Sequence, residues 1–174
     1  FELDGSVCKF TSPHDAIING VSIIYQERQL IPSMSVMENI FAGSLPRRKS
    51  GLIDRKTLRK NAQAVIDRFK LPIDPTIPVA RLSVAYQQMV EIMKAYCRES
   101  VVIAFDEPTA SLTDSEINIL FDLIQELKEE GKVILYVSHR MSEIFKIADD
   151  IVVLKDGRLV TTMKTSESTE NKLI

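Results

Sequence analysis

An apolar segment followed by two carboxylates is the pattern in this sequence with the clearest capacity for chemistry. Val101–Phe105 is a continuous apolar run, as expected of a strand buried on both faces of a sheet, and Asp106 and Glu107 follow it directly. Proteins with α/β sheets bind ligands at the carboxyl ends of their strands. In a phosphoryl-transfer site the first carboxylate would hold Mg²⁺, and the second would polarise the attacking water. Taken alone, the same residues could also simply begin a polar turn.

A histidine at the end of the next predicted strand adds to this pattern. Lys132–Val137 reads as that strand, and Ser138 and His139 follow it. Neighbouring parallel strands end at the same edge of a sheet, so we expect His139 to lie beside the two carboxylates. A neutral imidazole there could hydrogen-bond a terminal phosphate and orient the water. The chain has 2 histidines, so one at this position is informative.

Two further polar positions could contribute to a phosphate site. Ser83 stands just before a predicted helix at Gln87–Arg98, and a helix N-terminus attracts anions. Ordinary capping of the helix by Ser83 explains the same pattern and is favoured on geometry alone. Gln26 ends a predicted strand at Val21–Tyr25, where its amide could ligate Mg²⁺ or a water. Neither residue by itself distinguishes a nucleotide-binding site from an ordinary structural role.

The elements that would position these residues alternate between strand and helix in the second half of the chain. Apolar residues at helical spacing from Ile117 to Leu127 predict a helix, with Thr113 and Glu116 as its capping box. A short helix at Ser142–Ile147 follows the second strand. The further strands are 151–154 and 158–161, joined by a turn at residues 156–157. The alternation predicts a parallel sheet with helices on its faces.

The middle of the chain is predicted to be helical throughout. Helical patterns cover Val36–Phe41, Asp54–Lys70 and Gln87–Arg98, with no strand-like run between them. We therefore expect an all-helical insertion at 27–98 within an α/β core formed by 1–26 and 99–174.

The composition excludes several classes of protein. The 174 residues are 45% hydrophobic and 26% charged, which suits one globular domain. A net charge of −2 argues against a nucleic-acid binder that relies on bulk charge. The basic stretch from Arg47 to Lys60 is read as a solvated helix face rather than a nucleic-acid or lipid patch. Cys8 and Cys97 have no metal-ligand spacing, and no apolar run approaches the roughly 20 residues of a membrane span.

The order of the motifs resembles the ATP-binding-cassette (ABC) ATPases. Gln26 would belong to the Q-loop, Leu82-Ser83 to the signature, residues 106–113 (DEPTASLT) to the Walker B motif and D-loop, and Ser138-His139 to the H-loop. The residues of these motifs are similar to those of the first of the two tandem cassettes in the sugar-importer branch of the family, of ribose and galactose type. The resemblance implies a P-loop NTPase (RecA-like) parallel sheet with an inserted helical subdomain.

The resemblance also implies roles for individual residues. Asp106, with Gln26, would bind Mg²⁺; Glu107 would be the general base; and His139 would contact the γ-phosphate of ATP. Gln26 would couple the site to the helical insertion, and Ser83 would reach ATP held by the opposite cassette. The remaining expected nucleotide contacts, in the signature and the D-loop, are Ala85, Gln87 and Ser111.

Partners and location follow from the same resemblance. A second nucleotide-binding domain and a membrane permease would be direct partners, and a sugar-binding protein an indirect one. No nucleic-acid partner is expected. The chain would lie at the cytoplasmic face of the membrane as a peripheral subunit, and the intact protein would hydrolyse ATP.

The sequence departs from the family pattern in three ways. Val84-Ala85-Tyr86 stands where the commonest signature has Gly-Gly-Gln, and Thr113 replaces the usual D-loop aspartate. No G-x-x-x-x-G-K-[ST] motif occurs, so we expect a piece that begins after the P-loop helix and does not itself bind ATP usefully. The alternatives left open are a cassette ATPase acting on nucleic acid or the ribosome, and a degenerate cassette that only binds partners.

Overall fold

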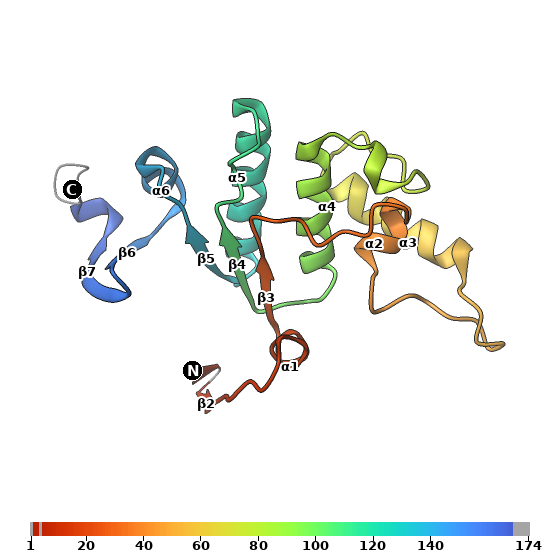
Figure 1. Cartoon of the computed structure of the whole chain (residues 1–174), viewed down its shortest axis with the longest axis horizontal. Coiled ribbons are helices and arrows are strands. Elements are labelled where there is room, and N and C mark those ends of the chain that lie inside the picture. Colours follow the sequence, from red (N-terminus) through yellow and green to blue (C-terminus); the bar gives the residue numbers. More distant parts are fainter. Residues whose placement is uncertain (1, 4, 169–174) are drawn as a thin grey trace.

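A three-stranded parallel sheet forms the centre of the molecule. The structure, a computed structural model, describes residues 2–3 and 5–168. Strands β3 (Val21–Ile24), β4 (Val102–Asp106) and β5 (Val133–Val137) lie in the order β3-β4-β5, all parallel (Figure 1). The predicted strands at these places are confirmed, with boundaries shifted by one residue. Each strand therefore delivers the residues that follow it to one edge of the sheet.

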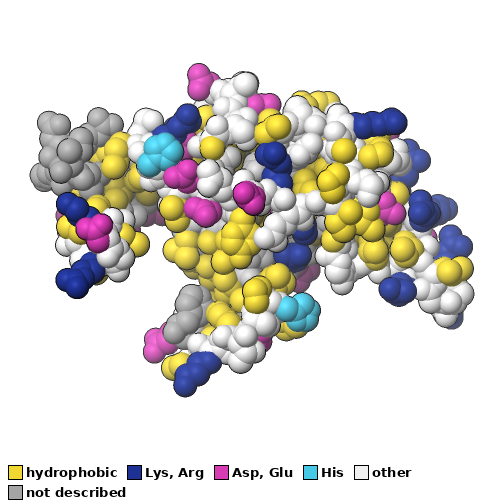
Figure 2. Space-filling view, viewed as in Figure 1, with side chains coloured by type: hydrophobic (Ala, Val, Ile, Leu, Met, Phe, Trp, Pro, Cys, Tyr) yellow, Lys and Arg dark blue, Asp and Glu magenta, His cyan; other side chains and the backbone are white. Residues whose placement is uncertain are grey.

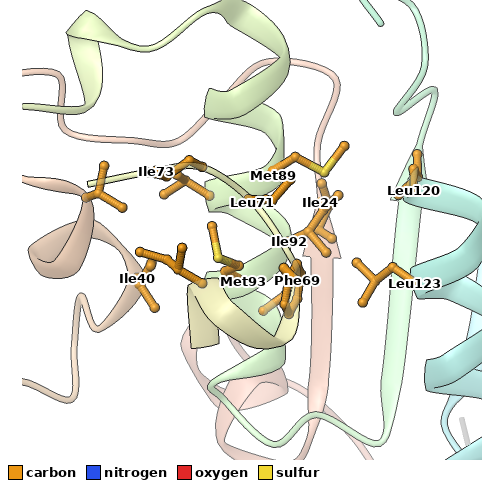
Figure 3. Packing of buried hydrophobic residues seen from close by; sticks show 14 of the residues in the cluster. Ile24, Ile40, Phe69, Leu71, Ile73, Met89, Ile92, Met93, Leu120 and Leu123 are labelled. Atoms are coloured by element: carbon orange, nitrogen blue, oxygen red, sulfur yellow. The ribbon is translucent and has the colours of Figure 1, made fainter. Parts of the chain in front are cut away.

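One face of this sheet packs into the core. Ile24, Phe105 and Tyr136 are aligned across the three strands and point to the same side. Ile24 lies between side chains of helix α4 (Val84–Tyr96) and of helix α5 (Asp114–Glu129), which contributes Leu120 and Leu123 (Figure 3). Removing these apolar side chains from water is the main force that holds the helices on the sheet.

The opposite face of the sheet is much more open. Val133, Leu135 and Val137 of β5 are 51%, 51% and 57% exposed, and Ile23 of β3 is 47% exposed. Hydrophobic side chains accordingly gather on the surface over the strands in the middle of the view (Figure 2). The expectation of helices on the faces of the sheet is thus met on one face of the described part of the chain. Burial on both faces was predicted for β4 alone, and there Val102, Ile103 and Phe105 are buried.

Helix α5 begins and ends where its sequence predicts. The backbone N–H of Thr113 donates to Glu116 Oε2 at 2.8 Å, within the predicted capping box. Gly131 follows the helix with a φ of +81°, a left-handed conformation that favours glycine. The helix leads the chain back to the start of β5, which makes β4 and β5 parallel.

The predicted helical insertion contains three α-helices. They are α2 (Val36–Ile40), α3 (Arg55–Arg68) and α4, with a 3₁₀ turn at Val79–Arg81. Helix α4 begins three residues before its predicted start at Gln87. Their buried side chains join those of the sheet and α5 in one continuous cluster. The division of the chain into 1–26, 27–98 and 99–174 stays a prediction.

The remaining elements flank this central part. Strands β1 (Glu2–Leu3) and β2 (Ser6–Val7) and helix α1 (Pro13–Ile18) were not predicted from the sequence. Helix α6 (Met141–Ile147) confirms the short predicted helix, and the 3₁₀ turn Thr165–Glu167 ends the described chain.

The predicted hairpin near the end of the chain is confirmed. Strands β6 (Asp150–Lys155) and β7 (Arg158–Lys164) pair antiparallel. Asp156 and Gly157 form the turn with φ angles of +50° and +72°. No helix among the described residues is both long enough and apolar enough to cross a membrane.

Candidate functional site

The carboxyl edge of the sheet gathers the acidic residues singled out in the sequence. Asp106 is the last residue of β4 and is aligned with Val137 of β5. The backbone N–H of Glu107 donates to the Val137 carbonyl at 2.9 Å, which fixes the start of the following turn. Glu107 has a φ of +45°, a left-handed conformation rare for a residue with a side chain. Strain of this kind persists where the surrounding contacts enforce it, and it is often found at functional sites.

Glu107 and His139 are in direct contact at this edge. Nδ1 of His139 lies 2.9 Å from Oε1 of Glu107. The His139 side chain is 72% exposed and that of Glu107 is 32% exposed, so both are accessible to a ligand. The structure therefore brings together the two residues to which the sequence assigned catalytic roles.

The contact bears on which ring nitrogen of His139 carries a proton. A carboxylate oxygen only accepts hydrogen bonds, so the short contact requires a proton on Nδ1 that is donated to Glu107. Nε2 of a neutral ring in this tautomer is an acceptor and cannot donate to a phosphate oxygen. His139 could contact a phosphate through Nε2–H if the ring were doubly protonated, or if Nδ1 left Glu107.

Asp106 and Gln26 fit a magnesium site of the open kind. Both residues are exposed and lie at the carboxyl ends of neighbouring strands: Asp106 is the last residue of β4, and Gln26 follows β3 by two residues. Mg²⁺ prefers oxygen ligands and usually takes one or two from a protein, with waters and substrate phosphates completing its shell. Within residues 2–3 and 5–168, no group of three or more His, Cys, Asp and Glu side chains forms a closed metal site. The donor set is thus suited to a metal bound together with a nucleotide.

A buried carboxylate that the sequence analysis did not single out lies behind this edge. The Glu143 side chain is 5% exposed and accepts hydrogen bonds from four side chains. Thr109 Oγ1 and Arg140 Nη1 lie 2.8 and 3.1 Å from Oε1, while Tyr136 Oη and Ser138 Oγ lie 2.8 and 3.1 Å from Oε2. Burial would raise the pKa of Glu143, but these hydrogen bonds outweigh it and hold the pKa below its ordinary value. The only sequence signal was an acidic residue in the first turn of the short helix after His139.

The signature segment forms the N-terminal cap of helix α4. Ser83 is exposed and caps α4, with Oγ accepting from the Tyr86 N–H at 3.4 Å, so the capping interpretation is confirmed. Ala85 is buried, and Nε2 of Gln87 donates to the Leu82 carbonyl at 3.0 Å. Among the described residues, no hydrogen bond or ion pair joins this segment to Asp106, Glu107 or His139.

Ser111 lies on the exposed turn that connects β4 to α5. Its predicted contact with nucleotide, and the anion-binding roles of Ser83, Ala85 and Gln87, stay predictions.

Comparison with protein families assigns the chain. Residues 3–110, well over half of the chain, match the family model described as ABC transporter. The chain belongs to the ABC transporter family. Gln26, Ser83, Asp106 and Glu107 lie inside the matched residues of this ABC transporter chain, and His139 lies beyond them.

Relatives of this ABC transporter chain are named as importers. It is 50% identical over 169 residues to the "Arabinose import ATP-binding protein AraG" of Yersinia pestis, covering 97% of the chain and 32% of that protein. It is 46% identical over 173 residues to the AraG protein of Mannheimia succiniciproducens, covering 99% of the chain and 34% of that protein. The chain therefore spans about a third of the length of the curated relatives it matches.

Solved ATP-binding cassettes share the fold of the ABC transporter chain. A nucleotide-free ATP-binding cassette from an ABC transporter aligns with a TM-score of 0.74 at 21% identity, covering 88% of this chain and 64% of that one. A cassette solved as a dimer in a post-hydrolysis state, bound to ADP and Pi, aligns with a TM-score of 0.76 at 22% identity, covering 94% and 72%. These similarities confirm the predicted α/β P-loop NTPase fold.

Proposed function

We propose that this chain is the water-activating part of an ATP-hydrolysing cassette that energises sugar import through an ABC permease. The contact between Glu107 and His139 beside Asp106 carries the proposal, because a carboxylate that could act as a base and an imidazole that could contact a phosphate meet at the carboxyl edge of the sheet. Membership of the ABC transporter family supports ATP as the substrate. The import function named for relatives 46% to 50% identical supports a sugar as cargo, with arabinose the first to test.

Glu107 is proposed as the general base. Its carboxylate would accept a proton from a water as the water oxygen bonds to the γ-phosphorus of ATP. The bond from that phosphorus to the β–γ bridging oxygen breaks at the same time, which gives ADP and phosphate. The fixed turn at residue 107 supports this role, since the hydrogen bond to Val137 holds the base in place before ATP binds.

His139 is proposed to orient the γ-phosphate and the water. In the observed geometry its Nδ1 proton is committed to Glu107. Nucleotide binding would then either compete with this pairing or require a doubly protonated ring that donates to both partners. In both cases the Oε2 atom of Glu107, which does not take part in the contact with His139, would be the oxygen that accepts the proton of the water.

Asp106 and Gln26 are proposed as the protein ligands of Mg²⁺. The ion, when bound with ATP, would neutralise part of the charge on the β- and γ-phosphates. Gln26 also begins the connection to the helical segment 27–98. We propose that this segment, as a subdomain, docks on the membrane permease.

The signature and D-loop residues are proposed to act across a dimer of cassettes. Ser83, Ala85, Gln87 and Ser111 would face nucleotide held by the second cassette rather than by this one. Among the described residues, no hydrogen bond or ion pair joins Ser83, Ala85 or Gln87 to Glu107 or His139, which is compatible with that arrangement. A second cassette and a permease at the cytoplasmic face of the membrane are therefore the proposed direct partners.

The phosphates of ATP also require a P-loop. The 174-residue sequence has no G-x-x-x-x-G-K-[ST] motif, so we propose that another segment of a longer protein supplies it. The 174-residue chain alone is then expected to show no measurable ATP binding by titration calorimetry. Saturable binding at micromolar ATP would contradict this part of the proposal.

Transport in reconstituted vesicles tests the function as a whole. The intact protein, assembled with its permease in liposomes, should take up labelled arabinose or a related sugar only when ATP and Mg²⁺ are present on the cassette side. ATP hydrolysis without uptake of any sugar would favour a cassette of another class. Absence of hydrolysis in the intact assembly would favour a degenerate cassette that only binds partners.

A further inference from the structure

Glu143 connects the two segments that carry the proposed base and the phosphate-directed histidine. Thr109 lies two residues after Glu107 in the turn that leaves β4. Ser138 and Arg140 lie on either side of His139. All three of these neighbours donate to the one Glu143 carboxylate. The carboxylate is therefore a junction between the turn that contains Glu107 and the turn that contains His139.

The Glu143 carboxylate is buried, and both of its oxygens accept hydrogen bonds. Thr109 is 2% exposed, the Glu143 side chain is 5% exposed, and Tyr136 donates a further hydrogen bond from within β5. Burial, followed by the hydrogen bond to Glu143, raises the pKa of Tyr136 well above its ordinary value, so the phenol stays a donor. Buried hydrogen bonds to a charged acceptor are strong, and losing the acceptor leaves several donors without a partner.

The hydrogen bonds to Glu143 also bear on the positions of Glu107 and His139 at the surface. Glu107 is held in a left-handed conformation between its own hydrogen bond to Val137 and the anchored Thr109. His139 is exposed, but both of its chain neighbours are tied to Glu143. The 2.9 Å contact of Glu107 with His139 thus forms between two backbone segments that both hydrogen-bond to Glu143.

We propose that Glu143 is a positioning residue that holds the Glu107 turn against the His139 turn. It acts through Thr109, Ser138 and Arg140 and touches neither the nucleotide nor the water. This inference rests on the proposed function for its effect on turnover, while its effect on the position of Glu107 does not.

The activity-independent test is amide hydrogen exchange of the chain, measured by NMR. Glu143→Gln replaces one acceptor oxygen by an NH₂ group, so the turn should loosen and the Glu107 amide should exchange roughly tenfold faster. The Val133 amide, which donates to Val101 at 2.9 Å at the other end of the same pair of strands, serves as the internal control and should be unchanged. Equal acceleration at both amides would mean global destabilisation and would overturn the proposal, as would an unchanged Glu107 amide.

A second pair of variants, at Thr109, tests the same hydrogen bond in case Glu143→Gln does not fold. Thr109→Val keeps the shape of the side chain and removes the hydroxyl, whereas Thr109→Ser keeps the hydroxyl. The first should accelerate exchange at Glu107 and the second should not. If both variants behave alike, the hydrogen bond to Glu143 does not position the turn.

Turnover by the intact protein gives the second readout. Glu143→Gln should lower kcat for ATP hydrolysis roughly 10- to 100-fold, with KM for ATP within about twofold, because the base is misplaced while the binding groups remain. Asp15→Asn is the control: it changes another hydrogen-bonded carboxylate to its amide, in the first turn of α1, and should leave kcat unchanged. A kcat for Glu143→Gln equal to that of the control would overturn the positioning role.

The two proposals fail in distinguishable ways. If Glu107→Gln retains hydrolysis, the proposed base is wrong whatever Glu143 does. If Glu107→Gln abolishes hydrolysis but Glu143→Gln changes neither kcat nor exchange at Glu107, the positioning proposal alone is wrong.

Discussion

Glu107 and His139 are 32 residues apart in sequence, yet Oε1 of one lies 2.9 Å from Nδ1 of the other. The pairing follows from the path of the chain: β4, helix α5 and β5 form a crossover that returns each strand end to the same edge. Glu107 follows β4 by one residue and His139 follows β5 by two. The contact is thus a product of strand register, which makes it sensitive to changes in the turns on either side.

Replacing His139 by glutamine should lower ATP hydrolysis by the intact protein at least about tenfold, because the side chain that orients phosphate and water is lost. ATP binding should change little, since the P-loop and metal ligands remain. Steady-state kinetics and a binding titration measure the two effects. The other histidine, the exposed His14 of α1, provides the control, and His14→Gln should behave as wild type. Equal activity of both variants would remove His139 from the mechanism.

Removing the cap of α4 should cost stability only modestly. The Ser83 hydroxyl accepts from the Tyr86 N–H at 3.4 Å, a long hydrogen bond, so Ser83→Ala should lower the free energy of unfolding by about 0.5 kcal/mol. Urea denaturation measures this change in the chain. If Ser83 also acts across the dimer, the same variant should lower ATP hydrolysis well beyond what the small loss of stability explains. Wild-type hydrolysis with the expected loss of stability would restrict Ser83 to its capping role.

Substitutions at two adjacent residues test which side of α5 packs into the core. Leu120 is 0% exposed, and Leu120→Ala should lower the free energy of unfolding by about 3 kcal/mol through lost burial and the cavity it leaves. Its neighbour Ile119 is 41% exposed, so Ile119→Ala should cost less than about 1 kcal/mol. Denaturant unfolding of the two variants measures both values. Similar costs at the two positions would contradict the packing of this helix on the sheet.

The charge of Glu143 should make the free energy of unfolding depend on pH. Since its pKa in the folded chain lies below the ordinary value of 4.5, its ionised form stabilises the fold above that pH. This contribution is lost as the pH falls through the lower folded value. The stability difference between wild type and Glu143→Gln should therefore be largest near about pH 7 and shrink below about pH 4.5. A difference that grows on acidification would reverse the assigned direction of the pKa shift.

Much of the fold could be predicted because its signals are local. The apolar run before Asp106, the helical spacing of α5 with its Thr113 cap, and the Asp156-Gly157 turn each depend on a few neighbouring residues. The order of Asp106, Glu107 and His139 along the chain sufficed to place them at one edge, because parallel strands share that edge.

Other features depend on contacts that no local pattern encodes. Residues 133–137 are apolar on both sides of the strand, so their sequence could not reveal that one side is half exposed. Glu143 was missed because its contact with Thr109, 34 residues earlier in the sequence, forms only in the folded chain. An acidic residue early in a helix is ordinarily explained by the helix dipole.

The most direct test of the central claim is ATP turnover by the intact protein carrying Glu107→Gln. The amide keeps the size of the side chain but cannot act as a base, so hydrolysis should fall at least about 100-fold while ATP and Mg²⁺ binding persists. Glu129→Gln on the exposed side of α5 is the control and should hydrolyse ATP as the wild type does. Hydrolysis by Glu107→Gln at the rate of this control would contradict the assignment of Glu107 as the base.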